Sequence, residues 1–379
     1  MNRLVIIGNG FDIAHGLKTS YMDFINWYWD KRVNSFIQND TTVSEDCLCK
    51  FTIIGKNLSS WKGFVYESNY FIKDKFSREK FSSNEVIEYI MDSPDIFSFE
   101  CSKFFETILQ SMKTKGWVDI ENDYYQLLKR GTDGSNCKYT TKDLNEQMKF
   151  VKNKLVEYLR TLVNASPKKE IDEVIHATFD SWDFSTRDMK RSLENLGFLA
   201  SEADEVHKDK RKYARKLRPR KTMLLSFNYT PTVKMYGGYD DTTNYIHGDL
   251  DYPENIIFGY GDELDKDYQE ILDRNDNELL NYVKSVKYLE TRNYRNLLEF
   301  INSGLFQVVI LGHSCGNSDR TLLNTVFEHQ NCVSIKPYYH KWDDGRDNYL
   351  DIVQNICRNF TDMKLFRDRV VNKEQCKTI

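Results

Sequence analysis

The sequence predicts an α/β fold in which a Rossmann-like, mainly parallel sheet is interrupted by a large helical insertion. Short runs of β-branched and apolar residues occur near both ends of the chain. Several are apolar on both faces, as in strands that helices cover on both sides. The middle of the chain instead repeats its apolar residues at helical spacing. A chain of 379 residues is long enough for two or three domains.

Six segments are expected to form strands, because each is a short apolar run that ends near a glycine or a polar residue. They are RLVII near residue 5, TMLLSF ending at Phe227, NYIHG ending at Gly248, NIIFGYG ending at Gly261, LFQVVILGHS ending at Ser314 and CVSIKPYY ending at Tyr339.

The helical insertion is expected mainly from DLNEQMKFVKNKLVEYLRTLVNA, whose apolar residues keep helical spacing. IENDYYQLLKR and KEIDEVIHATFDSW have helical patterns as well, and RTLLNTVFEH predicts a later helix. The predicted parts are a first part of the core at 1–29, a mainly helical insertion at 30–220 and a second part of the core at 221–379.

Composition excludes several classes of protein. The net charge of -4 predicts no general attraction to nucleic acid or to an anionic membrane. The eight cysteines are scattered without C-x-x-C or zinc-like spacing, so we expect reduced thiols and no metal site. The sequence has neither a signal-peptide core nor a membrane-spanning run, which predicts a cytoplasmic protein.

The first candidate site is the Gly8-Asn9-Gly10 turn after the first predicted strand. A strand that ends in G-x-G before a helix can direct backbone N–H groups toward a phosphate. A full G-x-G-x-x-G would need glycine where Ile13 stands, so a tight turn with nothing bound is the alternative. Asn9 and Asp12 favour a ligand site, because open α/β sheets bind ligands at the carboxyl ends of their strands.

The second candidate site pairs Asn228 with His247. Each follows a predicted strand, so two adjacent parallel strands would bring the amide and the imidazole to one crevice beside Gly8 and Gly10. The alternatives are a turn residue at Asn228 and a hydrogen-bonded strand-end histidine at His247.

The third is GHSCG at 312–316, which matches the G-x-S-x-G of a nucleophile elbow around Ser314. Only one clear strand follows it, and His329 falls inside the next predicted helix. We therefore expect a loop that lines the crevice, with Asp319 as helix cap or ligand contact.

Two further segments have both a structural and a functional interpretation. In WVDIENDYYQLLKR, Asp119 is expected to cap a helix with Trp117 packing beside it, while Glu121 could reach the crevice from the insertion. The basic run HKDKRKYARKLRPRK, residues 207–221, suits a solvated face or loop, with nucleic-acid binding as the alternative.

In this order, IGNGFDIAHGLKTSYMDF, WVDIE, FNYT, IHGD and GHSCGNSD resemble the motifs of the AbiH family of phage abortive-infection proteins. They run from the first strand to about residue 320, and the resemblance implies a role in antiphage defence. A more distant resemblance is to sirtuin-like domains, including the NAD-consuming ones of antiviral defence. There, a G-A-G loop cradles NAD, an asparagine follows in T-N-Y, and His-Gly supplies the catalytic histidine. Asn9 replaces the alanine, which should alter the fit to a pyrophosphate. The four-cysteine zinc module of deacylating sirtuins is absent, which argues against a deacylase.

These observations together predict an antiphage protein that binds a nucleotide and cleaves NAD, its substrate, at the nicotinamide–ribose bond. Asn228 would hold the ribose or nicotinamide and orient a water, and His247 would act as general base or hold a ribose hydroxyl. Asp12 and Glu121 would give electrostatic support. The expected binding contacts are Gly8, Asn9, Gly10, Phe11, Gly312, His313, Ser314 and Asp319.

Two other functions stay open from the sequence. One is a nucleotide-binding sensor or interaction module without turnover, and the other is a nucleic-acid-directed effector that uses the basic segment. We also expect a homo-oligomer, a phage component or partner protein as a contact, and no cofactor besides the substrate.

Overall fold

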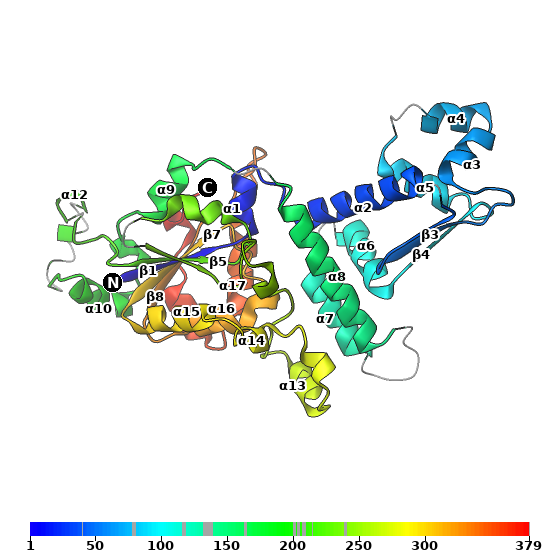
Figure 1. Ribbon diagram of the computed structural model, residues 1–379. Coiled ribbons are helices and arrows are strands. Elements are labelled where there is room, and N and C mark those ends of the chain that lie inside the picture. The colour runs from blue at the N-terminus through cyan, green and yellow to red at the C-terminus, as the bar shows by residue number, and fades with distance from the viewer. Residues whose placement is uncertain are drawn as a thin grey trace. The chain divides into compact units, whose positions relative to one another are not determined.

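The computed structural model describes residues 1–39, 41–77, 81–115, 119–131, 139–162, 165–199, 202, 205–206, 210–213, 215–238 and 241–378. The chain divides into two compact units (Figure 1). Unit 1 comprises Met1–Thr19 and Leu159–Ile379, and unit 2 comprises Ser20–Tyr158. Unit 1 thus includes residues 159–220, which the sequence assigns to the insertion. The reason is that Ile171 and Ile175 pack into the core of the sheet.

Unit 1 contains a five-stranded parallel sheet, which confirms the predicted Rossmann-like α/β class. Its order is β6-β5-β1-β7-β8, so the chain starts in the middle of the sheet, builds one side and then crosses to the other. The order reverses between β1 and β7, which is the place where doubly wound sheets bind ligands. The strands are β1 (Asn2–Ile7), β5 (Thr222–Ser226), β6 (Asp241–Tyr245), β7 (Phe306–Leu311) and β8 (Cys332–Pro337).

Every residue of β1 is buried, because helices cover both faces of the sheet. Leu4 and Ile6 belong to a core with α15 and α16, whereas Val5 and Ile7 belong to a core with α1 and α9. Figure 1 shows these two helix layers on opposite sides of the sheet. In the described part of unit 1 the α-helices include α1 (Asn9–Ala14), α9 (Lys169–Ile175), α10 (Thr186–Asn195), α12 (Lys210–Tyr213), α13 (Lys266–Asp273), α14 (Lys284–Lys287), α15 (Asn293–Asn302), α16 (Arg320–Phe327), α17 (Tyr349–Arg358) and α18 (Met363–Arg369).

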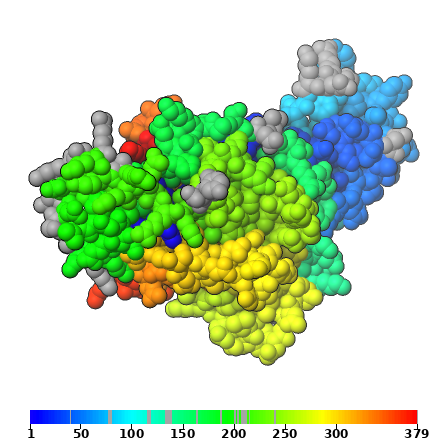
Figure 2. All heavy atoms as spheres, turned by 60° about the vertical axis from the view of Figure 1, so that its left-hand side comes forward, coloured from blue at the N-terminus to red at the C-terminus, as the bar shows by residue number. Residues whose placement is uncertain are grey.

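Short 3-10 helices connect several of these elements. They are η1 (Ser181–Asp183), η3 (Pro231–Tyr236), η4 (Pro253–Asn255), η5 (Asn277–Leu280), η6 (Asn317–Asp319) and η7 (Lys373–Gln375). The segment from α13 to α15, yellow in Figure 2, runs across the face of unit 1 that this view presents, and α13 stands out from it.

Five of the six predicted strands form, but NIIFGYG does not join the sheet. Its described backbone makes only an isolated bridge, between Tyr260 and Val283. Ile257 is nevertheless buried, and its N–H donates to the carbonyl of His247 at 2.8 Å. The apolar run therefore packs beside the edge strand β6 as a buried loop, which a short apolar pattern cannot distinguish from a strand.

Unit 2 is mainly helical and has a small antiparallel sheet, in the order β2-β3-β4. Aromatic rings of α2 pack on this sheet: the ring centroids of Phe36 and Phe51 are 5.3 Å apart, and those of Trp29 and Phe99 are 5.8 Å apart. The elements are α2 (Tyr21–Gln38), β2 (Val43–Glu45), β3 (Cys49–Ile53), α3 (Trp61–Glu67), α4 (Tyr70–Ser77), α5 (Ser83–Met91), β4 (Phe97–Cys101), α6 (Lys103–Lys115), α7 (Ile120–Gly131) and α8 (Thr141–Leu159). The predicted α7 and α8 are confirmed.

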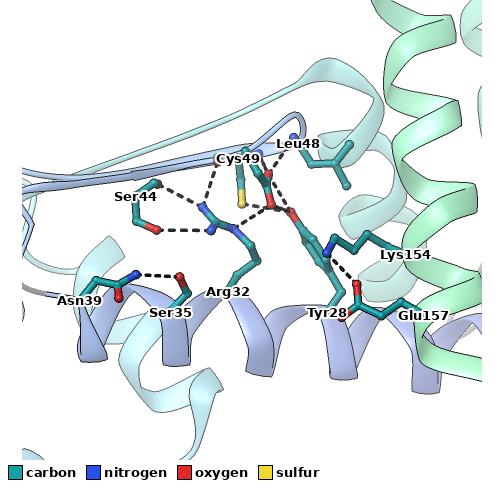
Figure 3. Close-up of polar contacts among 10 residues, drawn as sticks. Tyr28, Arg32, Ser35, Asn39, Ser44, Leu48, Cys49, Lys154 and Glu157 are labelled. Atoms are coloured by element: carbon teal, nitrogen blue, oxygen red, sulfur yellow. Dashed lines mark hydrogen bonds and ion pairs between the residues drawn. The ribbon is translucent and has the colours of Figure 1, made fainter. Parts of the chain in front are cut away.

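Hydrogen bonds and an ion pair connect α2 to the turn between β2 and β3 (Figure 3). Arg32 Nε lies 2.9 Å from Asp46 Oδ2, and Tyr28 Oη donates to the same carboxylate at 3.0 Å. The other oxygen, Oδ1, accepts the backbone N–H groups of Leu48 and Cys49 at 2.9 and 3.1 Å. Asp46 therefore closes the turn and joins it to the helix.

Candidate functional site

The loops that follow β1 and β7 touch at the carboxyl edge of the sheet. The N–H of Gly8 donates to Leu311 O at 3.1 Å, and the N–H of Gly10 donates to Gly312 O at 2.8 Å. This contact brings two of the predicted binding segments together at the point where the strand order reverses.

Packing explains the glycines of these loops, because the backbones of the two loops approach each other too closely to leave room for a Cβ. A Cβ added at Gly8 would lie 2.5 Å from His313 Cα, and one at Gly312 would lie 2.1 Å from Phe11 N. Gly312 also has φ +69°, a conformation that favours glycine. The N–H of Gly10 is already hydrogen-bonded. A phosphate contact at Gly8 and Gly10 stays a prediction, and the glycines do not require it.

Asn9 and Phe11 differ in what they can offer a ligand. Asn9 is exposed, and its Oδ1 accepts the Thr19 hydroxyl at 2.5 Å. The Phe11 ring is buried and packs edge-on against Tyr236 with centroids 5.5 Å apart. Phe11 is therefore a core side chain, and any ligand contact there would involve its backbone.

Asp12 and Asn228 take part in hydrogen bonds that join the segment after β1 to the segment after β5. The hydroxyl of Thr230 donates to Asp12 Oδ2 at 2.5 Å, and Asn228 Nδ2 donates to Gly8 O at 2.9 Å. Asp12 is buried, and burial raises the pKa of its carboxyl although the Thr230 hydroxyl acts in the other direction. Asn228 thus joins the loop after β1 to the end of β5.

A second group of buried polar side chains surrounds Asp319. Lys284 Nζ lies 2.8 Å from Asp319 Oδ1, and His247 Nε2 lies 3.3 Å from the same oxygen. His313 Nε2 lies 3.6 Å from Oδ2. We call Asp319, Lys284, His247 and His313 the Asp319 cluster. All four residues are less than a tenth exposed.

The elements of the fold explain how the cluster assembles. His247 lies two residues beyond β6, and His313 lies two residues beyond β7. The ring of Phe227, which follows β5, packs against both imidazoles, with centroids 5.2 Å from His247 and 4.2 Å from His313. The hydroxyl of Tyr288 is 3.2 Å from Nε2 of His247. β6 and β7 are separated by β5 and β1 in the sheet, and their carboxyl ends supply the two imidazoles at the same edge.

Burial and charge set the protonation of the cluster. Burial, together with the ammonium of Lys284, lowers the pKa of His247 to about 4. For Asp319, burial alone would raise the pKa, but Lys284 and His247 hold it well below its usual range. At neutral pH the cluster therefore contains a carboxylate, an ammonium and a neutral His247.

Hydrogen bonds also assign the protons on His313. The backbone N–H of Cys315 donates to His313 Nδ1 at 3.0 Å, so the ring proton belongs on Nε2, which faces Asp319.

Asp319 occupies the predicted cap position of α16, but its side chain makes no capping hydrogen bond. Its carboxylate faces Lys284 and His247 instead. The cap interpretation is therefore right about position and wrong about the side chain. Lys284 was not found from the sequence, because VKSVK contains two lysines of which Lys284 is buried and Lys287 pairs with Glu290. Periodicity alone does not separate the two.

Ser314 lies in a loop, as expected. Its side chain is exposed, and η6 separates it from α16, so the direct strand–turn–helix of a nucleophile elbow is not formed. The residue of this loop with a positive φ, 55°, is not Ser314 but its neighbour Cys315, which is buried. His329 lies just beyond α16 rather than inside it, and its Nε2 is 3.2 Å from Asn302 Oδ1.

The remaining predicted residues lie apart from these contacts. Asp119 caps α7 through Asn122 N at 3.1 Å, and Glu121 is buried in the first turn of the same helix, within unit 2. Its reach toward the edge of unit 1 stays a prediction, and Trp117 lies outside the described residues.

Of the basic segment, residues 207–209 and 214 lie outside the described residues. In the described part, Arg220 donates to Asn195 O at 3.0 Å, and Lys216 donates to Gly197 O at 3.4 Å. These carbonyls lie at and just beyond the end of α10, where a positive charge is favourable. Both contacts suit the structural interpretation, and nucleic-acid binding stays the alternative prediction.

The described residues lack two features, a membrane-spanning helix and a group of metal ligands. None of their helices has both the length and the apolar character needed to cross a membrane. No three His, Cys, Asp or Glu side chains among them are grouped so as to hold a metal ion.

A family model matches most of the chain. The family model described as bacteriophage abortive infection AbiH matches residues 4–340, which include the sheet edge and the Asp319 cluster. Among curated proteins, no match is found.

Proposed function

From the premise that the chain belongs to the AbiH family of bacteriophage abortive infection, we propose that it acts by cleaving NAD at the nicotinamide–ribose bond. The observation that carries the proposal is His247. It is a neutral, buried imidazole held against a carboxylate at the carboxyl edge of a Rossmann-like sheet. Open sheets of this kind bind ligands at that edge.

The proposed reaction uses water and releases nicotinamide. The bond between C1′ of the ribose and the nicotinamide nitrogen breaks, and its electron pair stays on nicotinamide. Water then forms the new bond to C1′ and loses a proton to solvent, which gives ADP-ribose. Because the transition state resembles an oxocarbenium ion, a hydrogen bond that strengthens at a ribose hydroxyl lowers the barrier.

His247 suits the second of its two predicted roles better than the first. A pKa of about 4 makes it a weak base at neutral pH, but a neutral imidazole still accepts a hydrogen bond. With the Nε2 proton directed at Asp319, the lone pair of Nδ1 is the acceptor for a ribose hydroxyl. Asn228 would act by positioning the loop after β1 through Gly8 O.

The test is incubation of the purified chain with NAD and identification of the products by mass. We expect nicotinamide and ADP-ribose from the wild type, and a roughly hundredfold lower rate from His247→Ala, the usual scale for such a group. His329→Ala is the matched control, because that imidazole lies outside the Asp319 cluster. Equal rates in both variants would contradict the role of His247.

A nucleotide-binding sensor without turnover is the second candidate, favoured by the burial of the whole Asp319 cluster. It predicts that NAD or ADP-ribose binds to the wild type and that no product forms over a long incubation. His247→Ala that still protects cells against phage and leaves cellular NAD unchanged would also support it.

A further inference from the structure

Lys284 is a buried cation for which the sequence offers no function. Its side chain is 1% exposed, and its backbone N–H donates to Tyr260 O at 2.8 Å. Gly261 packs so closely that a Cβ there would lie 3.1 Å from Lys284 Cβ. Burying an ammonium costs several kcal/mol unless a partner compensates it. The buried loop that contains Tyr260 and Gly261, where a strand was predicted, thus positions the Lys284 ammonium beside Asp319.

The geometry around Asp319 places Lys284 and His247 on one oxygen. Oδ1 lies 2.8 Å from Lys284 Nζ and 3.3 Å from His247 Nε2. An ionised carboxylate only accepts hydrogen bonds, so the imidazole nitrogen beside it favours the protonated form. The ammonium favours the ionised state of the carboxylate.

We propose that Lys284 is a positioning residue that keeps Asp319 ionised and thereby fixes His247 as the neutral tautomer with its proton on Nε2. The lone pair of Nδ1 is then the acceptor. The use of that acceptor for a ribose hydroxyl rests on the proposed function, but the arrangement of charges does not.

Several groups face His247, and their effects on a proton there differ in sign. The Lys284 ammonium and His313 disfavour a second proton on the imidazole, and the Asp319 carboxylate favours it. Tyr288 offers a hydroxyl, and burial makes any charge costly. Removal of the ammonium leaves the attraction of Asp319 opposed only by burial and by His313. His247 should then take up a proton at higher pH.

The experiment is a pH titration of the full chain with ¹³C-labelled histidine, observed by NMR. The His247 signal is assigned by its loss in His247→Gln. In the wild type we expect His247 to stay neutral down to about pH 5. In Lys284→Met the midpoint should rise by about one pH unit or more. Lys284→Arg, which keeps the charge, should resemble the wild type. An unchanged midpoint in folded Lys284→Met would overturn the proposal.

A second variant covers the case in which Lys284→Met does not fold. Lys284→Met with Asp319→Asn removes both charges, so neither is left buried without a partner. We expect the double variant to fold and to be more stable than Asp319→Asn alone. A double variant no more stable than that single one would overturn the pairing. Absence of NAD cleavage in the wild type would reject the proposed function and leave the titration result standing.

Discussion

Each unit holds a carboxylate beside a cation, Asp46 partly buried in unit 2 and Asp319 buried in unit 1, and the two pairs have different surroundings. In unit 2, Asp46 accepts two backbone N–H groups and the hydroxyl of Tyr28 besides Arg32. Burial raises the pKa of that hydroxyl, so none of these donors loses its proton near neutral pH. In unit 1, Asp319 faces Lys284 and two imidazoles, and it accepts no capping backbone N–H.

The difference indicates what each carboxylate does. A carboxylate that accepts hydrogen bonds from the backbone of its own turn stabilises that local backbone, and its partners do not change their protonation near neutral pH. A carboxylate that faces imidazoles is coupled to their protonation, and such arrangements occur at functional sites. All seven histidines of the sequence lie outside residues 20–158, so only unit 1 can respond in this way.

The largest difference between the two pairs should appear when each carboxylate becomes an amide. Asp319→Asn leaves the buried Lys284 ammonium without its counterion and should lower the free energy of unfolding of unit 1 by about 3–5 kcal/mol. Asp46→Asn keeps an acceptor for the turn and should cost unit 2 about 1–2 kcal/mol. Urea unfolding with hydrogen exchange, read separately in β7 and β3, measures both. Equal losses of unfolding free energy in the two variants would contradict the proposed difference between Asp319 and Asp46.

A second test asks whether the edge of unit 1 depends on the contact between its loops. Gly312→Ala places a Cβ 2.1 Å from Phe11 N at a positive φ and should cost about 3 kcal/mol or more. Gly16→Ala is the matched control, because Gly16 has φ +82° but no atom within 4 Å of an added Cβ. It should cost about 1 kcal/mol. Thermal unfolding compares the two, and a Gly312→Ala chain as stable as Gly16→Ala would contradict the packing argument.

Acid should loosen unit 1 before unit 2. The pKa of His247 falls from 6.5 in the unfolded chain to about 4 in the folded one, so stability is complete above about pH 6.5 and is lost as the pH falls toward 4. The full loss is about 3 kcal/mol. His176 acts in the opposite sense: burial would lower its pKa, but hydrogen bonds that the imidazole makes to Asp241 and to the backbone carbonyl of Asp172 raise it.

The measurement is urea unfolding at several pH values, with hydrogen exchange of each unit corrected for its intrinsic rate. His247→Gln should flatten the dependence of unit 1 between pH 6.5 and 5, and unit 2 should change little in that range. Equal loosening of β3 and β7 in this range would show that His247 is not responsible.

The smallest effect is expected at Ser314, which shares a loop with His313 but has an exposed side chain. The contact that holds this residue uses its carbonyl, which accepts Asn355 Nδ2 at 2.8 Å. Ser314→Ala should therefore change stability by less than about 0.5 kcal/mol and leave NAD turnover near the wild-type rate. Labelling of Ser314 by a serine-directed electrophile would instead support the nucleophile elbow.

The sequence by itself determined the fold class, five strands of the sheet, the helices α7 and α8, and the positions of His247 and Asn228 after their strands. These features follow from local periodicity, because alternating or continuous apolar runs predict which segments become buried wherever their partners lie. The glycines at 8, 10 and 312 were also visible as loop residues at strand ends.

Tertiary structure alone decided what these residues contact. Asn228 donates to Gly8 across 220 positions of the chain, and Lys284 reaches Asp319 across 35. It also decided that Ile257 packs in a loop instead of a strand, and that residues 159–220 belong with the sheet. The physical reason is that burial of a charge is stable only beside its partner, and that partner is chosen by the packing of distant segments, which no local pattern records.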